Sequence, residues 1–503
     1  MNNYYITTPI YYVNDSPHIG HAYTSIACDV MARFMRLSGY NVYFLTGTDE
    51  HGQKIAKSAE VKNIEPQIYT DKISESFRDL SPMLNLSNDD FIRTTEERHK
   101  ESALALWNKL LKNGYIYLDN YSGWYSVRDE AFYVEKDLID GKAPTGADVE
   151  WLEESSYFFS LSKFQDKLLE FYAQNPNFIE PESRLKEVIN FVKSGLNDLS
   201  ISRTSFQWGI KTPSDPKHVM YVWLDALTNY ISALGYPDAN SELYKNFWPA
   251  NIHMVGKDIL RFHAIYWPAF LMAADIPLPK KIVAHGWWTI EGEKMSKSLG
   301  NVIAPKDLVD QYGVDQTRYF LMREVPFGQD GNFSTESMKN RINSELANNI
   351  GNLAQRTLAF IYKNANASVP NIDVNKLYQE SLLEHLDSKI KTYIKSMESQ
   401  KFNQALDIAI DIANEANAFI DNEAPWSLRK TNITRMEEVL YCLCESLRYI
   451  AIILTPFMPK SMDKLLDQLN VSKENRELKH LNQENALKIN SPLPAPQGIF
   501  PRV

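Results

Sequence analysis

Hydrophobic and polar positions near the N-terminus first follow a strand pattern and then a helical one. Residues 4–13 are rich in aromatic and branched side chains, and Ser16-Pro17 then offers an N-cap followed by a first helical residue. Apolar residues recur at helical spacing over 19–37, and residues 41–46 form a second apolar strand. This β-α-β order predicts an α/β fold built on a parallel, Rossmann-like sheet.

The pattern changes further along the chain. A stretch with mixed strand and helix signals and the turn-rich run GKAPTGADVE indicates an insertion, after which the α/β pattern resumes. Later, proline and glycine become rare and the 3.6-residue period predicts an all-α bundle, followed by a polar tail that we expect to pack back. The predicted segments are the first half of the α/β domain (1–115), the insertion (116–215), the second half (216–280), a connecting region (281–340), the bundle (341–460) and the tail (461–503).

Composition limits the class of protein. Hydrophobic residues make up 44% and charged residues 23%, as in ordinary globular proteins, and the net charge of −10 argues against a globally basic nucleic-acid binder. The three cysteines form no CxxC pair, which excludes a cysteine zinc knuckle and fits a reducing compartment. The N-terminus does not resemble a signal peptide, and the longest apolar run is too short to cross a bilayer. We therefore expect a cytoplasmic protein without a membrane span.

The first motif that could take part in chemistry is His18-Ile19-Gly20-His21, directly after the first strand. The start of the helix favours an anion, and both histidines lie on one face of it. Gly20 leaves room for a base or phosphate to approach the backbone. Taken alone, the motif also fits a surface helix with two incidental histidines, or less well a metal-binding pair.

The second motif is Lys294-Met295-Ser296-Lys297-Ser298, in a glycine-flanked loop before a helix. Two mobile lysines can neutralise a polyphosphate leaving group, although a solvated basic loop would look the same. The chain has neither GxxxxGK[ST] nor GxGxxG, so neither a P-loop nor the usual dinucleotide fingerprint is supported.

Together the two motifs resemble HIGH and KMSKS of the class I aminoacyl-tRNA synthetases. Further stretches are similar to the methionyl-tRNA synthetase family of that class, and they extend over residues 7–426: TTPIYYVNDSPHIGH, FLTGTDEHG, VMYVWLDALTNY, VGKDILRFHAIYWPAF, KMSKSLGNVI, GNLAQR and APW. The resemblance implies a ligase that activates L-methionine with ATP, brought in with Mg²⁺. It then transfers methionine to the 3′-terminal adenosine of initiator and elongator tRNA(Met).

The resemblance also implies the site residues. Those matching the family's methionine pocket are Ile10, Tyr12, Asp49, Trp223, Ala226, Leu227, Tyr230, Ile259 and His263. Those matching its ATP site are His18, Gly20, His21, Lys294, Met295, Ser296, Lys297 and Ser298. Of these, His18, His21, Lys294 and Lys297 match the groups that stabilise the transition state, and the region 281–340 would carry KMSKS and contact the tRNA stem.

The sequence departs from the family's pattern at the zinc knuckle that many relatives carry in the insertion. The positions of the paired ligands fall at Ser126 and Asp129, and at Ala143 and Gly146. Alanine and glycine side chains cannot bind zinc, so we expect a zinc-free knuckle held by its own packing, and no metal site.

The bundle resembles the family's anticodon-binding domain. Asn352 and Arg356 lie four apart on one face of a predicted helix, and Pro425-Trp426 begins another. An exposed tryptophan there could stack on an anticodon base, whereas a buried one would only close two helices. No added dimerisation module follows the bundle, and we expect a monomer.

Other interpretations remain open at this point. The chain could be another class I ligase, for leucine, isoleucine, valine or cysteine, although the insertion looks short for an editing domain and no cysteine is placed to bind zinc. It could be a small nucleotidyltransferase with the HIGH fold, or a tRNA-binding paralogue without activity.

Overall fold

A parallel sheet of seven strands organises the described part of the N-terminal half. The computed structural model describes residues 2–129, 131–294, 301–373 and 381–503. The strand order is β2-β3-β1-β12-β13-β8, β4 also pairs with β3, and all neighbours are parallel. The strands are β1 (Asn3–Thr7), β2 (Tyr11–Tyr12), β3 (Asn41–Asp49), β4 (Asp90–Arg93), β8 (Ile179–Glu180), β12 (Ile252–Gly256) and β13 (Ile282–His285).

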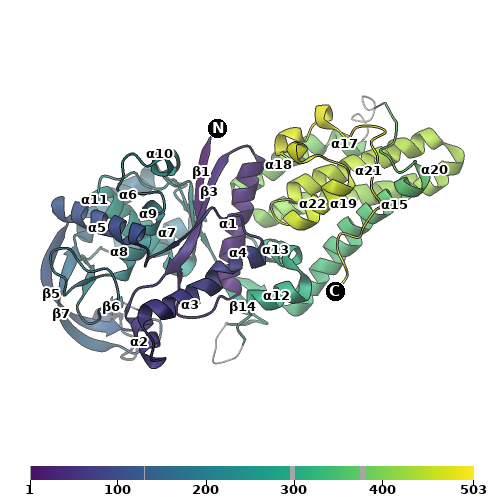
Figure 1. Ribbon diagram of the computed structural model, residues 1–503. Helices are drawn as coiled ribbons and strands as arrows, with labels where there is room; N and C mark the ends of the chain where they lie inside the picture. The colour runs from purple at the N-terminus through teal and green to yellow at the C-terminus, as the bar shows by residue number, and fades with distance from the viewer. Residues whose placement is uncertain (1, 130, 295–300, 374–380) are drawn as a thin grey trace.

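Helices cover both faces of this sheet. Along β1, Tyr4 and Ile6 belong to one hydrophobic core and Tyr5 to the other, as the period of two requires. Figure 1 shows α1 (Ile19–Leu37) on the side of the sheet toward the C-terminal bundle, and α5 (Glu97–Lys112), α8 (Val222–Leu227), α9 (Asn229–Ser232) and α11 (Trp267–Ala273) on the opposite side. The predicted Rossmann-like α/β architecture is therefore confirmed.

Two local predictions at the first β-α-β unit were wrong. The strand expected over 4–13 is divided into β1 and β2 around Pro9, which has no N–H to donate to a ladder. Ser16 is not the N-cap of α1, because the helix begins at Ile19 with His18 as its cap. The imidazole of His18 accepts the hydrogen bond that a serine hydroxyl would otherwise accept.

The segment predicted as an insertion contains a separate antiparallel sheet, ordered β6-β5-β7-β9. Its strands are β5 (Ile116–Ser126), β6 (Ala131–Tyr133), β7 (Glu150–Phe159) and β9 (Leu199–Ser200). Between β7 and β9, helices α6 (Gln165–Gln174) and α7 (Glu182–Lys193) flank β8, which joins the central sheet. The range 116–215 is thus not a single separate unit, because a parallel strand inside it belongs to the main sheet.

Short elements connect the sheet to the bundle and to the insertion. The hairpin β10 (Ser202–Arg203) and β11 (Val219–Met220) precedes α8, and β14 (Trp288–Ile290) pairs with β15 (Glu293–Lys294) and β16 (Gly331–Phe333). The other α-helices described before the bundle are α2 (Gln53–Val61), α3 (Pro66–Arg78), α4 (Leu80–Leu84), α10 (Glu242–Phe247), α12 (Pro305–Tyr312), α13 (Val314–Arg323) and α14 (Thr335–Arg341).

The C-terminal region is helical, as predicted. A π-helical segment, Ile342–Gly351, continues α14 into α15 (Asn352–Asn364). The bundle adds α17 (Ser381–Glu384), α18 (Leu386–Glu398), α19 (Phe402–Glu423), α20 (Pro425–Thr431), α21 (Ile433–Leu454) and α22 (Pro459–Gln468). The tail packs back on it, since Phe500 is buried and the Val503 amide donates to Asn343. None of the described helices is long and apolar enough to cross a membrane.

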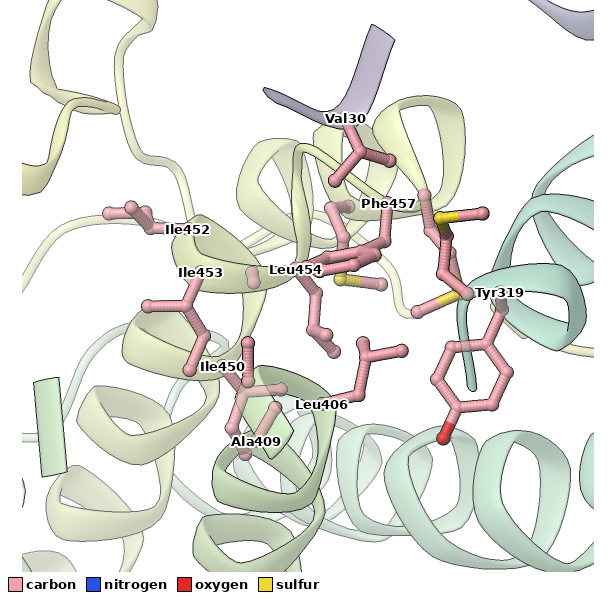
Figure 2. Packing of buried hydrophobic residues seen from close by; sticks show 14 of the residues in the cluster. Val30, Tyr319, Leu406, Ala409, Ile450, Ile452, Ile453, Leu454 and Phe457 are labelled. Carbon is pink, nitrogen blue, oxygen red and sulfur yellow. The ribbon is translucent and has the colours of Figure 1, made fainter. Parts of the chain in front are cut away.

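One continuous hydrophobic core joins the sheet to the bundle. Figure 2 shows Val30 of α1 beside Phe457, with Tyr319 of α13 and Leu406 of α19 in the same cluster. Because these apolar side chains come from both halves, the bundle is held to the sheet as part of one core.

A fully buried ion pair lies within this junction. The Arg318 guanidinium on α13 donates to Asp29 on α1 at 2.6 Å, and to the carbonyls of Leu84, Pro456 and Phe457 at 3.0, 2.8 and 2.8 Å. Burial would raise the pKa of Asp29, but Arg318 and Arg33 outweigh it and lower the value. Arg318 therefore ties α1, α4, α13 and the α21–α22 turn together.

Replacing Arg318 with methionine should destabilise the protein by about 3–5 kcal/mol, because a buried carboxylate loses its main partner. Denaturant unfolding followed by circular dichroism measures this loss. Arg98→Met is the control. Arg98 is 43% exposed and its pairs with Asp90 and Glu96 lie at the surface, so its loss should stay below about 1 kcal/mol. Equal losses in the two variants would contradict the role assigned to Arg318.

Candidate active site

A cavity of about 590 Å³ opens at the carboxyl ends of the central strands. Its walls include Ile10 after β1, Asp49 at the end of β3, Gly256 at the end of β12, and His285 at the end of β13. Parallel sheets commonly bind ligands at this edge, because the loops that follow the strands converge there.

All nine residues predicted to contact methionine line this cavity, together with His18, Gly20 and His21. They come from the ends of β1 and β3, from β2, α1, α8 and α9, and from the segment after β12. Residues far apart in the sequence thus converge on one space.

The two histidines of the first motif are held by the backbone. The His18 Nδ1 accepts the Gly20 N–H at 3.1 Å, and the His21 Nδ1 accepts the His18 N–H at 3.1 Å. The rings lie 3.9 Å apart between centroids. Burial lowers the pKa of His18, and burial together with His18 lowers the pKa of His21 well below its usual range. Both rings are therefore neutral near pH 7 and carry their proton on Nε2, which makes Nε2–H a hydrogen-bond donor.

Tyr230 and His263 form a buried pair at the cavity wall. The Tyr230 hydroxyl lies 2.6 Å from the His263 Nε2, and the His263 Nδ1 lies 3.0 Å from the Ile259 carbonyl. A carbonyl can only accept, so Nδ1 carries the proton and Nε2 accepts from Tyr230. Burial lowers the pKa of His263 to about 4, which keeps the ring neutral.

Trp223 is half-buried and stacks on Phe262, with centroids 3.6 Å apart and planes 8° from parallel. Phe262 was not predicted from the sequence. Its position in the aromatic-rich run RFHAIYW was a signal, but which of these rings supports Trp223 depends on the π-helical turn Phe262–Tyr266.

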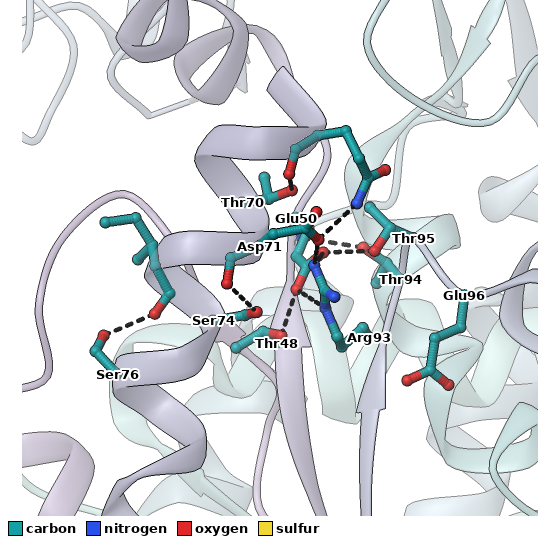
Figure 3. Close-up of polar contacts among 12 residues, drawn as sticks. Thr48, Glu50, Thr70, Asp71, Ser74, Ser76, Arg93, Thr94, Thr95 and Glu96 are labelled. Carbon is teal, nitrogen blue, oxygen red and sulfur yellow. Dashed lines mark hydrogen bonds and ion pairs between the residues drawn. The ribbon is translucent and has the colours of Figure 1, made fainter. Parts of the chain in front are cut away.

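Asp49 is followed by two residues that bind buried networks. The Glu50 carboxylate accepts from Arg93 at 2.7 and 2.8 Å, from Thr48 at 2.7 Å and from Thr95 at 2.6 Å. Figure 3 shows this group between β3 and β4. The His51 ring contacts Asp225. The segment that follows Asp49 is therefore held through Glu50 to β4 and through His51 to α8. Glu50 and His51 were not predicted as functional residues, although both lie in the run GTDEHG.

The second motif is described only at its first residue. The backbone of Lys294 ends β15, opposite Thr289, a residue of the cavity wall. The predicted ATP contacts Met295, Ser296, Lys297 and Ser298 lie outside the described residues.

Of the residues predicted to read the anticodon, the structure brings Arg356 and Trp426 together. Trp426 is 45% exposed, so the alternative of a buried tryptophan closing two helices is wrong. The Arg356 guanidinium lies 5.5 Å from the centroid of the Trp426 ring and 2.6 Å from Asp421. Asn352 is exposed on the same helix as Arg356, and Pro425 is buried at the start of α20. Asp421 was not predicted.

Known proteins are similar to this chain over nearly its whole length. A family model described as "tRNA synthetases class I (M)" matches residues 4–149 and 134–358, and one described as "Anticodon binding domain of methionyl tRNA ligase" matches residues 369–503. A methionine–tRNA ligase from Rickettsia bellii is 63% identical, with 100% of this chain and 99% of the relative covered. One from Brucella suis is 53% identical, with 99% and 98% covered.

The chain therefore belongs to the methionine–tRNA ligase family of class I aminoacyl-tRNA synthetases. Among solved structures, Mycobacterium tuberculosis methionyl-tRNA synthetase in complex with methionyl-adenylate matches with a TM-score of 0.96 and 48% identity, covering 100% of both chains. The apo form of the same enzyme matches with a TM-score of 0.89.

The knuckle of this family member is held by hydrogen bonds around Asp129. The Asp129 carboxylate accepts from Thr145 and from Tyr133, the latter at 3.1 Å, and the Asp129 amide donates to Ser126 at 3.2 Å. In the second turn, the Gly146 amide donates to the Ala143 carbonyl at 2.7 Å. Among the described residues, no group of three His, Cys, Asp or Glu side chains is placed to hold a metal ion. The absence of zinc stays a prediction, which metal analysis of the purified protein tests.

Acidification should destabilise the folded protein through His263. Its pKa is about 4 when folded and 6.5 when unfolded, so on lowering the pH the unfolded chain binds the proton first. The stability from the neutral ring is present above pH 6.5 and is lost progressively down to about pH 4, amounting to about 2 kcal/mol between pH 7 and 5.

Urea unfolding of the wild type and of His263→Gln at both pH values isolates this contribution. The wild type should lose more stability than the variant by that amount. The same pH dependence in both proteins would show that His263 is not the group responsible.

Proposed function

We propose that the cavity performs both steps of methionine–tRNA ligation. The observation that carries this proposal is the convergence of the nine predicted methionine contacts and both HIGH histidines on one cavity. In the first step the methionine carboxylate attacks the α-phosphorus of ATP, methionyl-adenylate forms and pyrophosphate leaves. In the second, the 3′-terminal ribose of tRNA(Met), initiator or elongator, attacks the acyl carbon and AMP leaves.

The first step needs positioning and charge stabilisation rather than a protein nucleophile. The neutral rings of His18 and His21 can donate Nε2–H to phosphate oxygens as negative charge develops, with Lys294 and Lys297 acting on the leaving pyrophosphate. Gly20 lines the same cavity, and a Cβ there would lie 2.9 Å from the His18 ring, so glycine leaves room for that ring to cap the helix. Mg²⁺ enters with ATP, as part of that substrate.

The methionine pocket combines one carboxylate with an apolar wall. In this proposal Asp49 holds the substrate ammonium, while Ile10, Tyr12, Trp223 and Tyr230 surround the thioether. Their shared position on the cavity wall supports the assignment. A flexible, polarisable thioether gains favourable contacts with aromatic rings. Ala226, Leu227, Ile259 and His263 complete the wall.

The division of labour follows the predicted segments. Residues 1–115 and 216–280 form the catalytic domain, to which β8 also contributes a strand. The rest of 116–215 is the connective insertion, 281–340 the KMSKS and stem-contact region, 341–460 the anticodon-binding domain, and 461–503 the supporting tail. We further propose that the enzyme acts as a cytoplasmic monomer, which size-exclusion chromatography with light scattering tests for the oligomeric state.

Pyrophosphate exchange across all twenty amino acids tests the first step. The protein should exchange with methionine, and far more weakly with leucine, isoleucine, valine or cysteine. Rapid exchange with one of those and none with methionine would overturn the assignment.

His21→Ala should lower the rate of adenylate formation about 10²–10³-fold, since a removed oxyanion donor typically costs that much. It should leave methionine binding nearly unchanged, which single-turnover kinetics separates from the rate.

Trp426→Ala tests the proposed anticodon contact. The exposed ring can stack on an anticodon base while Asn352 and Arg356 contact base edges. Losing one stacking contact costs about 1–3 kcal/mol, so tRNA charging should weaken roughly 10- to 100-fold. Pyrophosphate exchange and the melting temperature should hardly change. Tyr362→Ala is the control, because it removes a different exposed ring, which lies on α15. Intact charging by Trp426→Ala would show that the anticodon assignment is wrong.

A further inference from the structure

A buried carboxylate behind the cavity wall connects three separate parts of the chain. Asp225 on α8 is fully buried. One of its oxygens lies 2.6 Å from the His51 Nδ1, and the other lies 2.8 Å from the His99 Nε2 on α5. The His99 Nδ1 in turn lies 3.0 Å from the Ser232 hydroxyl on α9. Asp225, His51, His99 and Ser232 are named the Asp225 network below.

The charge on Asp225 fixes how the network is bonded. Burial by itself would raise the pKa of this carboxyl, but His51 and His99 outweigh burial and bring it to about 2. An ionised carboxylate can only accept hydrogen bonds, so His51 donates from Nδ1 and His99 from Nε2. Such charge-assisted bonds in a dry interior are strong and directional.

The network joins the two sides of the methionine pocket without touching the cavity. Asp225 lies between Trp223 and Ala226 on α8, a helix of six residues. The three residues of α8 that were predicted to contact methionine, Trp223, Ala226 and Leu227, all line the cavity. His51 lies two residues after Asp49, and Glu50 between them is held by Arg93 of β4. Asp225 itself is not among the lining residues.

We propose that Asp225 is a positioning residue for the amino acid: by holding His51 and His99, it sets the separation between the Asp49 carboxylate and the apolar wall on α8. The inference rests on the proposed function, because it assigns Asp49 to the ammonium and α8 to the side chain. When this separation is fixed, an amino acid of methionine's length can place its ammonium at Asp49 and its side chain against α8 at the same time. The network therefore acts on amino-acid binding and not on ATP.

Two substitutions test this role in pyrophosphate exchange. Asp225→Asn keeps the shape of the side chain, but only its one amide oxygen can accept, so it cannot accept the N–H groups of both histidines. His51→Ala removes one of the two donors. Each should raise the KM for methionine about tenfold or more, since losing one hydrogen bond to a charged group typically changes an equilibrium constant by that factor or a larger one. The kcat and the KM for ATP should stay within about threefold, because the lost contacts act on substrate binding.

A conservative variant separates positioning from general stability. In His51→Asn the amide Nδ2 occupies the place of Nδ1 and can still donate to Asp225, so the KM for methionine should largely recover. Glu445→Gln is the matched control. It removes a buried carboxylate paired with Arg448 in the bundle, and should lower the melting temperature while leaving the KM for methionine unchanged.

Three outcomes would overturn the inference: an unchanged KM in Asp225→Asn, a rise of equal size in the KM for ATP, or a His51→Asn variant as impaired as His51→Ala. If Asp225→Asn does not fold, the two His51 variants decide. Failure of the wild type to exchange pyrophosphate with methionine would instead refute the proposed function.

Discussion

The contact between Arg318 and Asp29 is the constraint on which the arrangement of the two halves depends. Both side chains are fully buried, and burying two charges is costly unless all their hydrogen-bonding capacity is satisfied. Here the guanidinium reaches a carboxylate and three main-chain carbonyls, contributed by α1, α4 and the α21–α22 turn. The geometry is therefore satisfied in only one relative placement of these elements. Since His18 caps α1 and His21 lies in its first turn, that placement also orients the HIGH motif relative to the bundle.

Burial also sets the chemistry of the cavity. His18, His21 and His263 are kept neutral by burial, and in each ring a partner on Nδ1 or Nε2 fixes the position of the proton. Asp225 remains charged in a similar environment, because two imidazoles donate to it. Desolvation favours the neutral form of a group unless specific partners stabilise the charged one. Burial alone thus gives neutral donors at the proposed phosphate site, whereas hydrogen bonds from two imidazoles overcome burial and keep an anion behind the proposed amino-acid pocket.

Hydrogen bonds around Asp129 hold the turn that follows β5. Asp129 accepts from two hydroxyls, and its amide donates to Ser126. These contacts link the turn after β5 to β6 and to the loop around Thr145. Local hydrogen bonds of this kind can define the fold of a small element, although each contributes only about 1 kcal/mol.

The sequence by itself determined the order of elements, the fold class and the motifs, because hydrophobic periodicity and motif spacing are local properties of the chain. It predicted the β-α-β start and the helical C-terminal region, and its resemblance to the family implied the nine residues that line one cavity. It did not predict that His18 caps its own helix, since cap identity depends on where the backbone turns after Pro9 and Pro17. Only the tertiary structure decided the partners of Asp225, Glu50 and Arg318. The contacts His51–Asp225, Arg93–Glu50 and Arg318–Asp29 join residues more than forty positions apart. No local pattern specifies which distant donor will meet a given buried carboxylate.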